Sequence, residues 1–145
     1  MLKDSKDVVI DTNLLVRYLT EDDPQKAKAV DTLLNSAAKG GLKILIPSVV
    51  IAELVWVLES FYKMAADDIT GLVEAILNTP GVDAQDKSVI KAALKLYRST
   101  KVELVDAWIV QFAKAKGAKR IYTFDKKHFR DAEEVEILSP VNKFR

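Results

Sequence analysis

The sequence predicts one α/β domain, spanning residues 1–145, in which helices cover both faces of a mostly parallel sheet. Short apolar runs typical of strands alternate with longer segments whose apolar residues recur at helical spacing. The expected strands are residues 8–10, 42–46, 82–84, 121–124 and 135–138. This alternation favours parallel strands covered on both faces. The 145 residues suffice for a single core, and no linker or repeat divides them.

The first expected strand, residues 8–10, reads as buried and ends on a carboxylate. Asp11, Thr12 and Asn13 follow it, and all three residue types favour turns and helix N-caps. Helical spacing of apolar residues then predicts a helix to about residue 19. Asp11 therefore stands at the carboxyl end of a strand, the edge where open α/β sheets bind ligands. Two interpretations stay open: Asp11 caps the helix, or it belongs to a ligand site.

Turn and cap signals delimit the next helices. Asp23 is the expected N-cap of a second helix, Pro24 lies in its first turn, and Gly40 and Gly41 end it. A further helix over residues 66–78 ends at a Pro-Gly turn signal that leads into the very short third strand.

A carboxylate interrupts the most apolar helix of the sequence. Ser48 is its expected cap, and every residue from Val49 to Leu58 is apolar except Glu53. A helix that is apolar all round is buried, and a lone buried carboxylate is costly unless it is paired, protonated or bound to a cation. A site role is therefore favoured for Glu53. The alternative is that Glu53 lies on a narrow exposed strip or pairs with a lysine.

The same anomaly recurs later in the chain. Between Leu104 and Val110 only Asp106 is polar, in a segment expected to form a buried helix. Aspartate is a poor helix former and a poor core residue, so a site role is favoured for Asp106. Glu103 lies three residues earlier on the same helix face. Because Thr100 precedes Glu103 by three residues, the pair also fits a capping box, and both interpretations of Glu103 stay open.

A fourth carboxylate, Asp125, directly follows the expected strand at residues 121–124. As with Asp11, a cap or turn role is the alternative to a site role. The carboxyl edge of the sheet is where Asp11, Glu53, Asp106 and Asp125 are candidates for one common site.

These four acids indicate a divalent-cation site. Bare carboxylates a few ångströms apart repel one another, and divalent cations remove that repulsion. Oxygen ligands suit Mg²⁺ or Mn²⁺ better than zinc; the chain has no cysteine, and its one histidine, His128, cannot form a His-rich site alone. One or two such cations support phosphodiester hydrolysis without a nucleophilic side chain, and none of these candidates is a nucleophile with an adjacent base.

Composition bounds the remaining function classes. A formal net charge of +1 gives no strong overall field, so a polyanion would have to bind a local patch. The lack of cysteine excludes disulfides and thiolate catalysis and suits a reducing compartment. The sequence shows neither a signal peptide nor the roughly 18 apolar residues of a membrane span. We therefore expect a soluble, cytoplasmic protein.

Four segments match one family in order and position. They are Val9-Ile10-Asp11-Thr12-Asn13, Ser48-Val49-Val50-Ile51-Ala52-Glu53-Leu54, Val105-Asp106-Ala107-Trp108-Ile109 and Tyr122-Thr123-Phe124-Asp125. With them the sequence resembles a PIN domain, and specifically the VapC-type toxins of bacterial and archaeal toxin–antitoxin pairs. The resemblance covers nearly the whole chain, and it implies a three-layer α/β/α sandwich with a short, mostly parallel sheet.

The resemblance also implies the chemistry. In that family the residues at the positions of Asp11, Glu53, Asp106 and Asp125 form the Mg²⁺-binding site of a ribonuclease. We expect Asp11 and Asp106 to hold the main metal directly, and Glu53 and Asp125 to act directly or through bound water. A further acid, usually Asp, often stands where this chain has Glu103, whose longer side chain places its oxygens differently.

The resemblance implies supporting residues and partners too. A hydroxyl near the site is matched by Thr12 or Thr123, with Asn13 as a local hydrogen-bonding partner, and these three would orient carboxylates or water. Homodimers and a cognate VapB-like antitoxin that plugs the site are typical. Local basic residues would hold RNA, although lysines at helix ends are normally just solvated. The basic candidates are Arg17, Lys116, Lys119, Arg120, Lys126 and Lys127.

Two alternative functions remain. One is a PIN-like RNA-processing nuclease outside a toxin system, and the other is a catalytically inactive module that binds RNA or protein. Trp56, Phe61 and Tyr62 are candidates for a dimer or antitoxin groove, and core packing explains them equally well.

Overall fold

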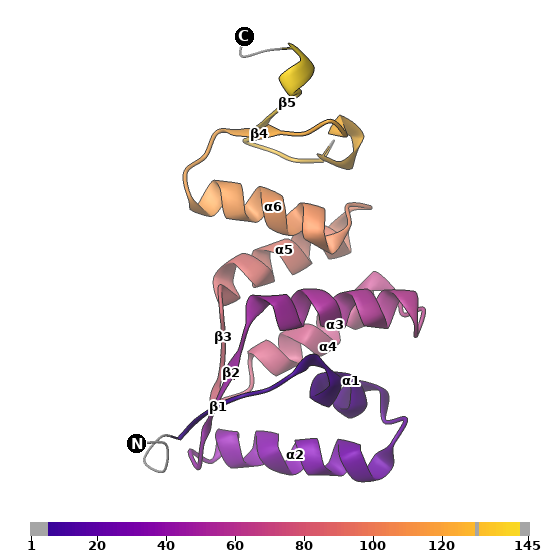
Figure 1. The fold of residues 1–145 in the computed structure, drawn as a ribbon, viewed down its shortest axis with the longest axis vertical. Helices are drawn as coiled ribbons and strands as arrows, with labels where there is room; N and C mark the ends of the chain where they lie inside the picture. Colours follow the sequence, from indigo (N-terminus) through magenta and orange to yellow (C-terminus); the bar gives the residue numbers. More distant parts are fainter. Residues whose placement is uncertain (1–5, 130, 143–145) are drawn as a thin grey trace. The chain divides into compact units, whose positions relative to one another are not determined.

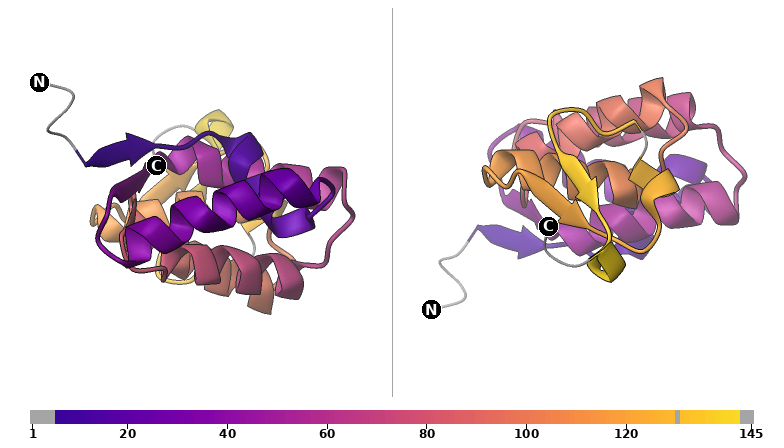
Figure 2. Two further views of the ribbon diagram at one scale, coloured as in Figure 1. Left: turned by 90° about the horizontal axis from the view of Figure 1, so that it is seen from below. Right: turned by 90° about the horizontal axis from the view of Figure 1, so that it is seen from above.

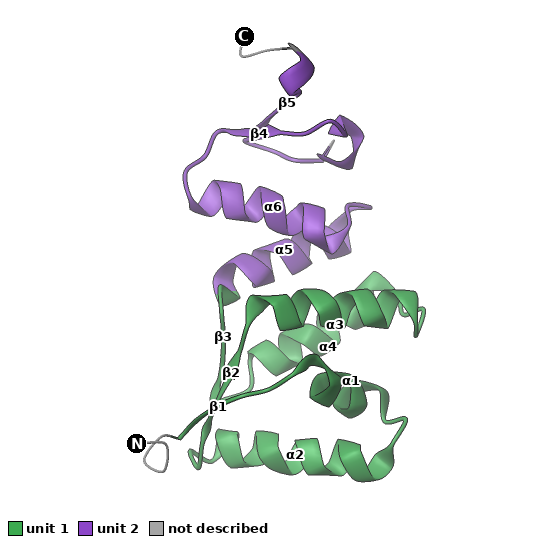
Figure 3. Cartoon of the chain, viewed as in Figure 1, with its two compact units in different colours: residues 1–87 green, residues 88–145 purple. Residues whose placement is uncertain are grey.

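The computed structural model describes residues 6–129 and 131–142. It divides into two compact units, residues 1–87 and 88–145, and each unit has its own parallel sheet (Figure 3). In the described part of the chain, no helix has the length and apolar content needed to cross a membrane. The single domain expected over residues 1–145 stays a prediction.

Unit 1, residues 1–87, is built on a three-stranded parallel sheet in the order β1–β2–β3 (Figure 1). The strands are β1 (Asp7–Val9), β2 (Lys43–Ile46) and β3 (Val82–Ala84). Ile44, in the central strand, pairs with Val8 on one side and Val82 on the other. Because β1 lies at the edge of this sheet, Val9 is exposed and not buried as its apolar run suggested. Asp11 follows the carboxyl end of β1, as predicted.

Four helices complete unit 1. They are α1 (Thr12–Thr20), α2 (Pro24–Ala38), α3 (Ser48–Ser60) and α4 (Ala66–Leu77). α1 packs against α2 and α3, α3 packs against α4, and α2 and α4 contact strands of the sheet (Figure 2). The largest fully buried side chains of this unit are Leu15, Ile44, Ile46, Ile51, Leu54, Leu58, Ile69 and Leu77.

Local cap signals placed the first two helix starts correctly. Asp11 is the N-cap of α1, and its Oδ1 accepts a hydrogen bond of 2.7 Å from the Thr12 N–H. Asp23 is the N-cap of α2, and its Oδ1 accepts a hydrogen bond of 3.1 Å from the Lys26 N–H. Both carboxylates satisfy backbone donors that the first turn of a helix leaves free.

The predicted cap of α3 is wrong. Pro47 occupies the N-cap position, and Ser48 is the first helical residue with no capping bond from its side chain. The Ser48 N–H instead donates to Oε1 of Gln85, 3.0 Å away. Since Gln85 directly follows β3, the free donor at the start of α3 is satisfied by a residue distant in sequence, which no local cap signal reveals.

The prediction that α3 is buried all round is also wrong. Val49 is 69% exposed, Trp56 is 65% exposed, and Glu53 is exposed between them. The spacing of these three residues places them on one strip of the helix, while the remaining faces are largely buried. The exposed-strip alternative therefore holds for Glu53. The interpretation of Trp56 as a core residue is therefore wrong. The same holds for Phe61, which lies just beyond the helix and is 74% exposed.

Unit 2, residues 88–145, holds the remaining elements, with α5 beginning one residue before it. They are α5 (Lys87–Ser99), α6 (Leu104–Ala115), β4 (Arg120–Tyr122), the 3₁₀ helix η2 (Lys126–Phe129), β5 (Glu136–Leu138) and the 3₁₀ helix η3 (Pro140–Asn142). Ile121 pairs with Ile137 in a parallel β4–β5 ladder. A core of Val110, Ala113, Ile121, Phe129 and Val135 joins α6, β4 and η2 to the start of β5, and Leu96 of α5 packs against it. All strand pairings of the described residues are parallel, which confirms the predicted α/β class.

Two expectations for α6 fail. Val105, Ile109 and Phe112 are exposed at helical spacing, so this helix is not buried all round. Thr100 is not its cap either, because its hydroxyl donates to the Leu96 carbonyl at 2.8 Å and so belongs to the end of α5. Glu103 itself is the N-cap, without a hydrogen bond from its side chain to the helix. The capping-box interpretation of Glu103 is therefore wrong.

Replacing Gly81 by alanine should destabilise the fold strongly. Gly81 has a φ of +83°, and an added Cβ would lie 2.2 Å from the Ala37 carbonyl oxygen. We expect a loss of roughly 2–4 kcal/mol in the free energy of unfolding. Gly71, within α4, is the matched control: nothing described lies within 4 Å of an added Cβ there. Gly71→Ala should raise stability by about 1 kcal/mol. Equal denaturation midpoints for the two variants would contradict the prediction.

Candidate active site

Thr12 links the two candidate carboxylates of unit 1. Its backbone N–H donates to Oδ1 of Asp11, and its side-chain hydroxyl donates to Oε1 of Glu53. Thr12 is only 6% exposed, whereas Asp11 and Glu53 are both exposed. A buried residue with few available rotamers therefore holds carboxylates from the start of α1 and the middle of α3 side by side.

These two acids line a cavity of about 510 Å³ within unit 1. Asn13 and Arg17 line it from α1, and Phe61 and Tyr62 line it from the end of α3. The other lining residues are Thr12, Val16, Asp22 and Val57. Among all of these, Arg17 alone carries a positive charge, and no ion pair joins it to another described residue. The lining of the cavity thus combines three carboxylates, one guanidinium and two aromatic rings.

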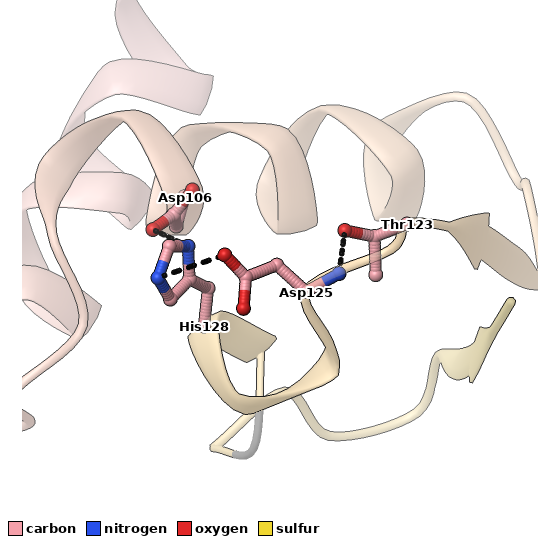
Figure 4. Close-up of polar contacts among 4 residues, drawn as sticks. All are labelled: Asp106, Thr123, Asp125 and His128. Carbon is pink, nitrogen blue, oxygen red and sulfur yellow. Dashed lines mark hydrogen bonds and ion pairs between the residues drawn. The ribbon is translucent and has the colours of Figure 1, made fainter.

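In unit 2, His128 lies between two candidate carboxylates (Figure 4). Its Nδ1 is 3.8 Å from Oδ2 of Asp106, and its Nε2 is 3.3 Å from Oδ2 of Asp125. Asp106 lies in the first turn of α6, and Asp125 lies three residues beyond the end of β4. The Asp125 N–H donates to the Thr123 hydroxyl at 3.0 Å, so Thr123 fixes the turn that carries this acid.

The pKa of Asp106 is raised in this cluster. Burial raises the pKa of Asp106 above its usual value, His128 lowers it, and the charges of Glu103 and Asp125 raise it further. The side chain is 18% exposed, which explains why burial is the largest cause. The raised pKa means that the negative charge on Asp106 is incompletely compensated by its protein neighbours. A bound cation would compensate it.

A smaller cavity of about 210 Å³ adjoins this cluster within unit 2. Its lining includes Glu103 and Asp106 together with Lys127, His128 and Asp131. Glu103 therefore lines the same cavity as Asp106. It occupies the N-cap position of α6, but its side chain makes no capping hydrogen bond. A ligand role for Glu103 stays a prediction.

The predicted basic residues differ in their local surroundings. Arg17 and Lys127 each line a cavity that contains candidate acids. Arg120 instead pairs with Glu136, with 3.3 Å between Nε and Oε1, and Lys116 places its Nζ 5.8 Å from the centre of the Phe112 ring. Lys119 and Lys126 are simply exposed. Their roles in RNA binding stay predictions, with Arg17 and Lys127 the best placed.

Sequence reasoning missed the part that His128 plays. It was set aside because one histidine cannot form a His-rich site, yet it contacts two of the four candidate acids. Its position three residues after Asp125 was the available signal, since that spacing brings two side chains together in a helical turn. The contact with Asp106, 22 positions away, needed the tertiary structure.

The donor chemistry suits a hard divalent cation. Asp11 and Glu53 offer carboxylate oxygens in unit 1, and Asp106 and Asp125 offer them in unit 2, which are the ligands that Mg²⁺ and Mn²⁺ prefer. Within the described residues, no group of three or more His, Cys, Asp and Glu side chains is arranged to hold a metal ion. In unit 2 the imidazole of His128 lies between the two carboxylates and would have to move for both to bind one ion.

Comparisons with known proteins matched this chain to a family model, a curated relative and a solved structure. The family model of the PIN domain matches residues 8–135. The VapC ribonuclease of Aquifex aeolicus (strain VF5) is 30% identical over 119 residues, which cover 82% of this chain and 87% of the relative. A chain from the crystal structure of VapBC2 from Rickettsia felis bound to a DNA fragment from their promoter is 17% identical; the match covers 92% of this chain and 98% of that chain, with a TM-score of 0.36.

Proposed function

We propose, because this chain belongs to the PIN domain family, that it is a cytoplasmic, metal-dependent endoribonuclease and the toxin of a type II toxin–antitoxin pair. The relative from Aquifex aeolicus carries the name of a ribonuclease, and its similarity extends over most of both chains. The observation that supports the proposal most directly is the carboxylate pair of Asp11 and Glu53, which Thr12 holds beside a cavity. We further propose a cognate VapB-like antitoxin and a homodimer.

Mg²⁺ or Mn²⁺ is the proposed cofactor. Asp11 and Asp106 would bind it directly, and Glu53 and Asp125 directly or through water. The chemistry that a bound cation would supply is activation of water for attack on a phosphodiester and stabilisation of the leaving oxygen. The chain's own residues orient the carboxylates. Thr12 holds Glu53 through its hydroxyl, Thr123 holds the backbone of Asp125, and both contacts limit the motion of potential ligands.

Cleavage of a mixed pool of structured RNA by the purified protein tests this function. We expect cleavage with Mg²⁺ or Mn²⁺ and none with EDTA, because the reaction is proposed to need the cation for its nucleophile. Cleavage that persists in EDTA would contradict the metal mechanism. A protein that neither cleaves RNA nor binds either metal in calorimetry would favour the inactive binding module instead.

Thr12→Val should reduce the rate of cleavage by about 10–100-fold, the usual effect of removing a group that orients a metal ligand. Valine keeps the shape of the buried side chain but cannot donate to Glu53. Thr12→Ser keeps the hydroxyl and should restore most of the rate. The melting temperature of each variant, measured by circular dichroism, serves as the folding control. Equal rates for the valine and serine variants would show that the hydroxyl has no part in the reaction.

A further inference from the structure

We propose that the cavity beside Asp11 and Glu53 binds one unpaired nucleotide of the RNA, with its base stacked on Phe61 and its phosphate paired with Arg17. This inference rests on the proposed function and names the substrate feature that the site recognises. It depends on three properties of unit 1: an exposed aromatic ring held in place, a single cation in an acidic cavity, and a suitable volume.

The ring of Phe61 is exposed and packs edge to face against Tyr62. It is 74% exposed, which for a phenylalanine leaves a large apolar face in water. The Phe61 N–H caps α3 by donating to the Val57 carbonyl at 2.9 Å. The ring meets Tyr62 edge to face, with 4.9 Å between centroids and 67° between planes. Tyr62 in turn donates its hydroxyl hydrogen to Asp22, in the turn between α1 and α2.

This arrangement suits base stacking. The edge contact with Tyr62 orients the Phe61 ring, and the Tyr62–Asp22 hydrogen bond anchors Tyr62. A ring that is already ordered loses little entropy when a flat ligand stacks on it, so more of the interaction energy appears as affinity. Every nucleobase offers a π-face, and therefore this contact does not depend on base identity.

Arg17 determines where a phosphate can lie. The cavity contains three carboxylates, from Asp11, Asp22 and Glu53, which repel a phosphodiester. Arg17 is the single positively charged residue among those that line it and forms no ion pair with a described residue. Its planar guanidinium is therefore available for charge-assisted hydrogen bonds to phosphate oxygens. A volume of about 510 Å³ lies within the range of sites that hold small organic ligands.

The bound nucleotide has to be unpaired. Bases inside an A-form duplex are stacked on their neighbours, so a protein ring cannot reach their faces. Phe61 is on a short turn after α3 and can contact only a base that has left the stack. A base stacked on Phe61 would therefore come from a single-stranded segment, a loop or a bulge.

Fluorescence anisotropy with a labelled single-stranded RNA of roughly twelve nucleotides tests the proposal, with the same backbone lacking its bases as the second probe. The measurement is made in EDTA and so needs no cleavage. Phe61→Ala should weaken binding of the normal strand by about 5–150-fold and leave binding of the abasic strand unchanged. Phe61→Tyr should retain affinity. Trp56→Ala is the matched control, since Trp56 is 65% exposed but does not line the cavity, and it should change neither affinity.

Arg17→Gln separates the phosphate contact from the base contact. It should weaken binding of both strands alike and reduce the salt dependence of binding by about one phosphate contact. If the wild-type protein does not bind the single strand, or if Phe61→Ala binds as wild type does, the nucleotide site is overturned. A Phe61→Ala variant with unchanged affinity but an altered mass in light scattering would identify the surface as a protein interface. Cleavage of the RNA pool by the wild-type protein, measured separately, tests the proposed nuclease function independently of the nucleotide site.

Discussion

RNA cleavage should fall by about a thousandfold or more when Asp106 is replaced by asparagine. Asparagine keeps the size of the side chain but removes the charge proposed to bind the cation, and a lost metal contact removes several kcal/mol of transition-state stabilisation. Single-turnover cleavage with Mg²⁺ and with Mn²⁺ measures the effect. An Asp106→Asn variant that cleaves at the wild-type rate would remove Asp106 from the site.

The stability of the same variant is its folding control. Because the pKa of Asp106 is raised in the folded protein, the native state binds its proton more tightly than the unfolded chain does. Wild-type stability therefore falls as pH rises through that pKa, and the cost is fully present above it. In EDTA, Asp106→Asn should melt at or a few degrees above the wild type near neutral pH. This gain should disappear in acid, below the usual pKa of aspartate.

The double variant D11N/D106N should cleave RNA no more slowly than the slower of the two single variants does. Each single change is expected to cost about a thousandfold, and independent effects would multiply to about a millionfold. Residues that serve one chemical step are strongly non-additive, because the second substitution removes a function that the first has already lost. The four rate constants, including the wild type's, form a double-mutant cycle.

Multiplicative losses would contradict this prediction. They would mean that Asp11 and Asp106 contribute separately, for example one to RNA binding and the other to hydrolysis. Lys43→Gln is a suitable control in both backgrounds, since Lys43 is an exposed residue of β2 that pairs with Asp83. It should leave every rate in the cycle unchanged, because a surface ion pair contributes little.

The limits of sequence reasoning show most clearly in α3 and α6. Their long apolar runs predicted burial on every side, yet each exposes a strip with apolar members, Val49 and Trp56 in one and Val105, Ile109 and Phe112 in the other. A helix pattern reveals its buried face when polar residues mark the opposite face, and here apolar residues occupy both. The predicted burial of Glu53, which made this residue unusual in the sequence, was therefore wrong. Its hydrogen bond with Thr12 keeps it among the candidate residues.

The sequence by itself determined the alternation of elements and the caps at Asp11 and Asp23, because these depend on residues within one helical turn or one strand. It also indicated the parallel class of the strands, because parallel pairs need the long helical connections that the alternation provides. It also singled out Asp11, Glu53, Asp106 and Asp125 by their chemical contrast with apolar neighbours. Tertiary structure alone decided that Thr12 reaches Glu53 across 41 positions and that His128 lies between Asp106 and Asp125. It also decided which aromatic rings face solvent. These features depend on contacts between elements distant in sequence, which folding creates and local patterns do not encode.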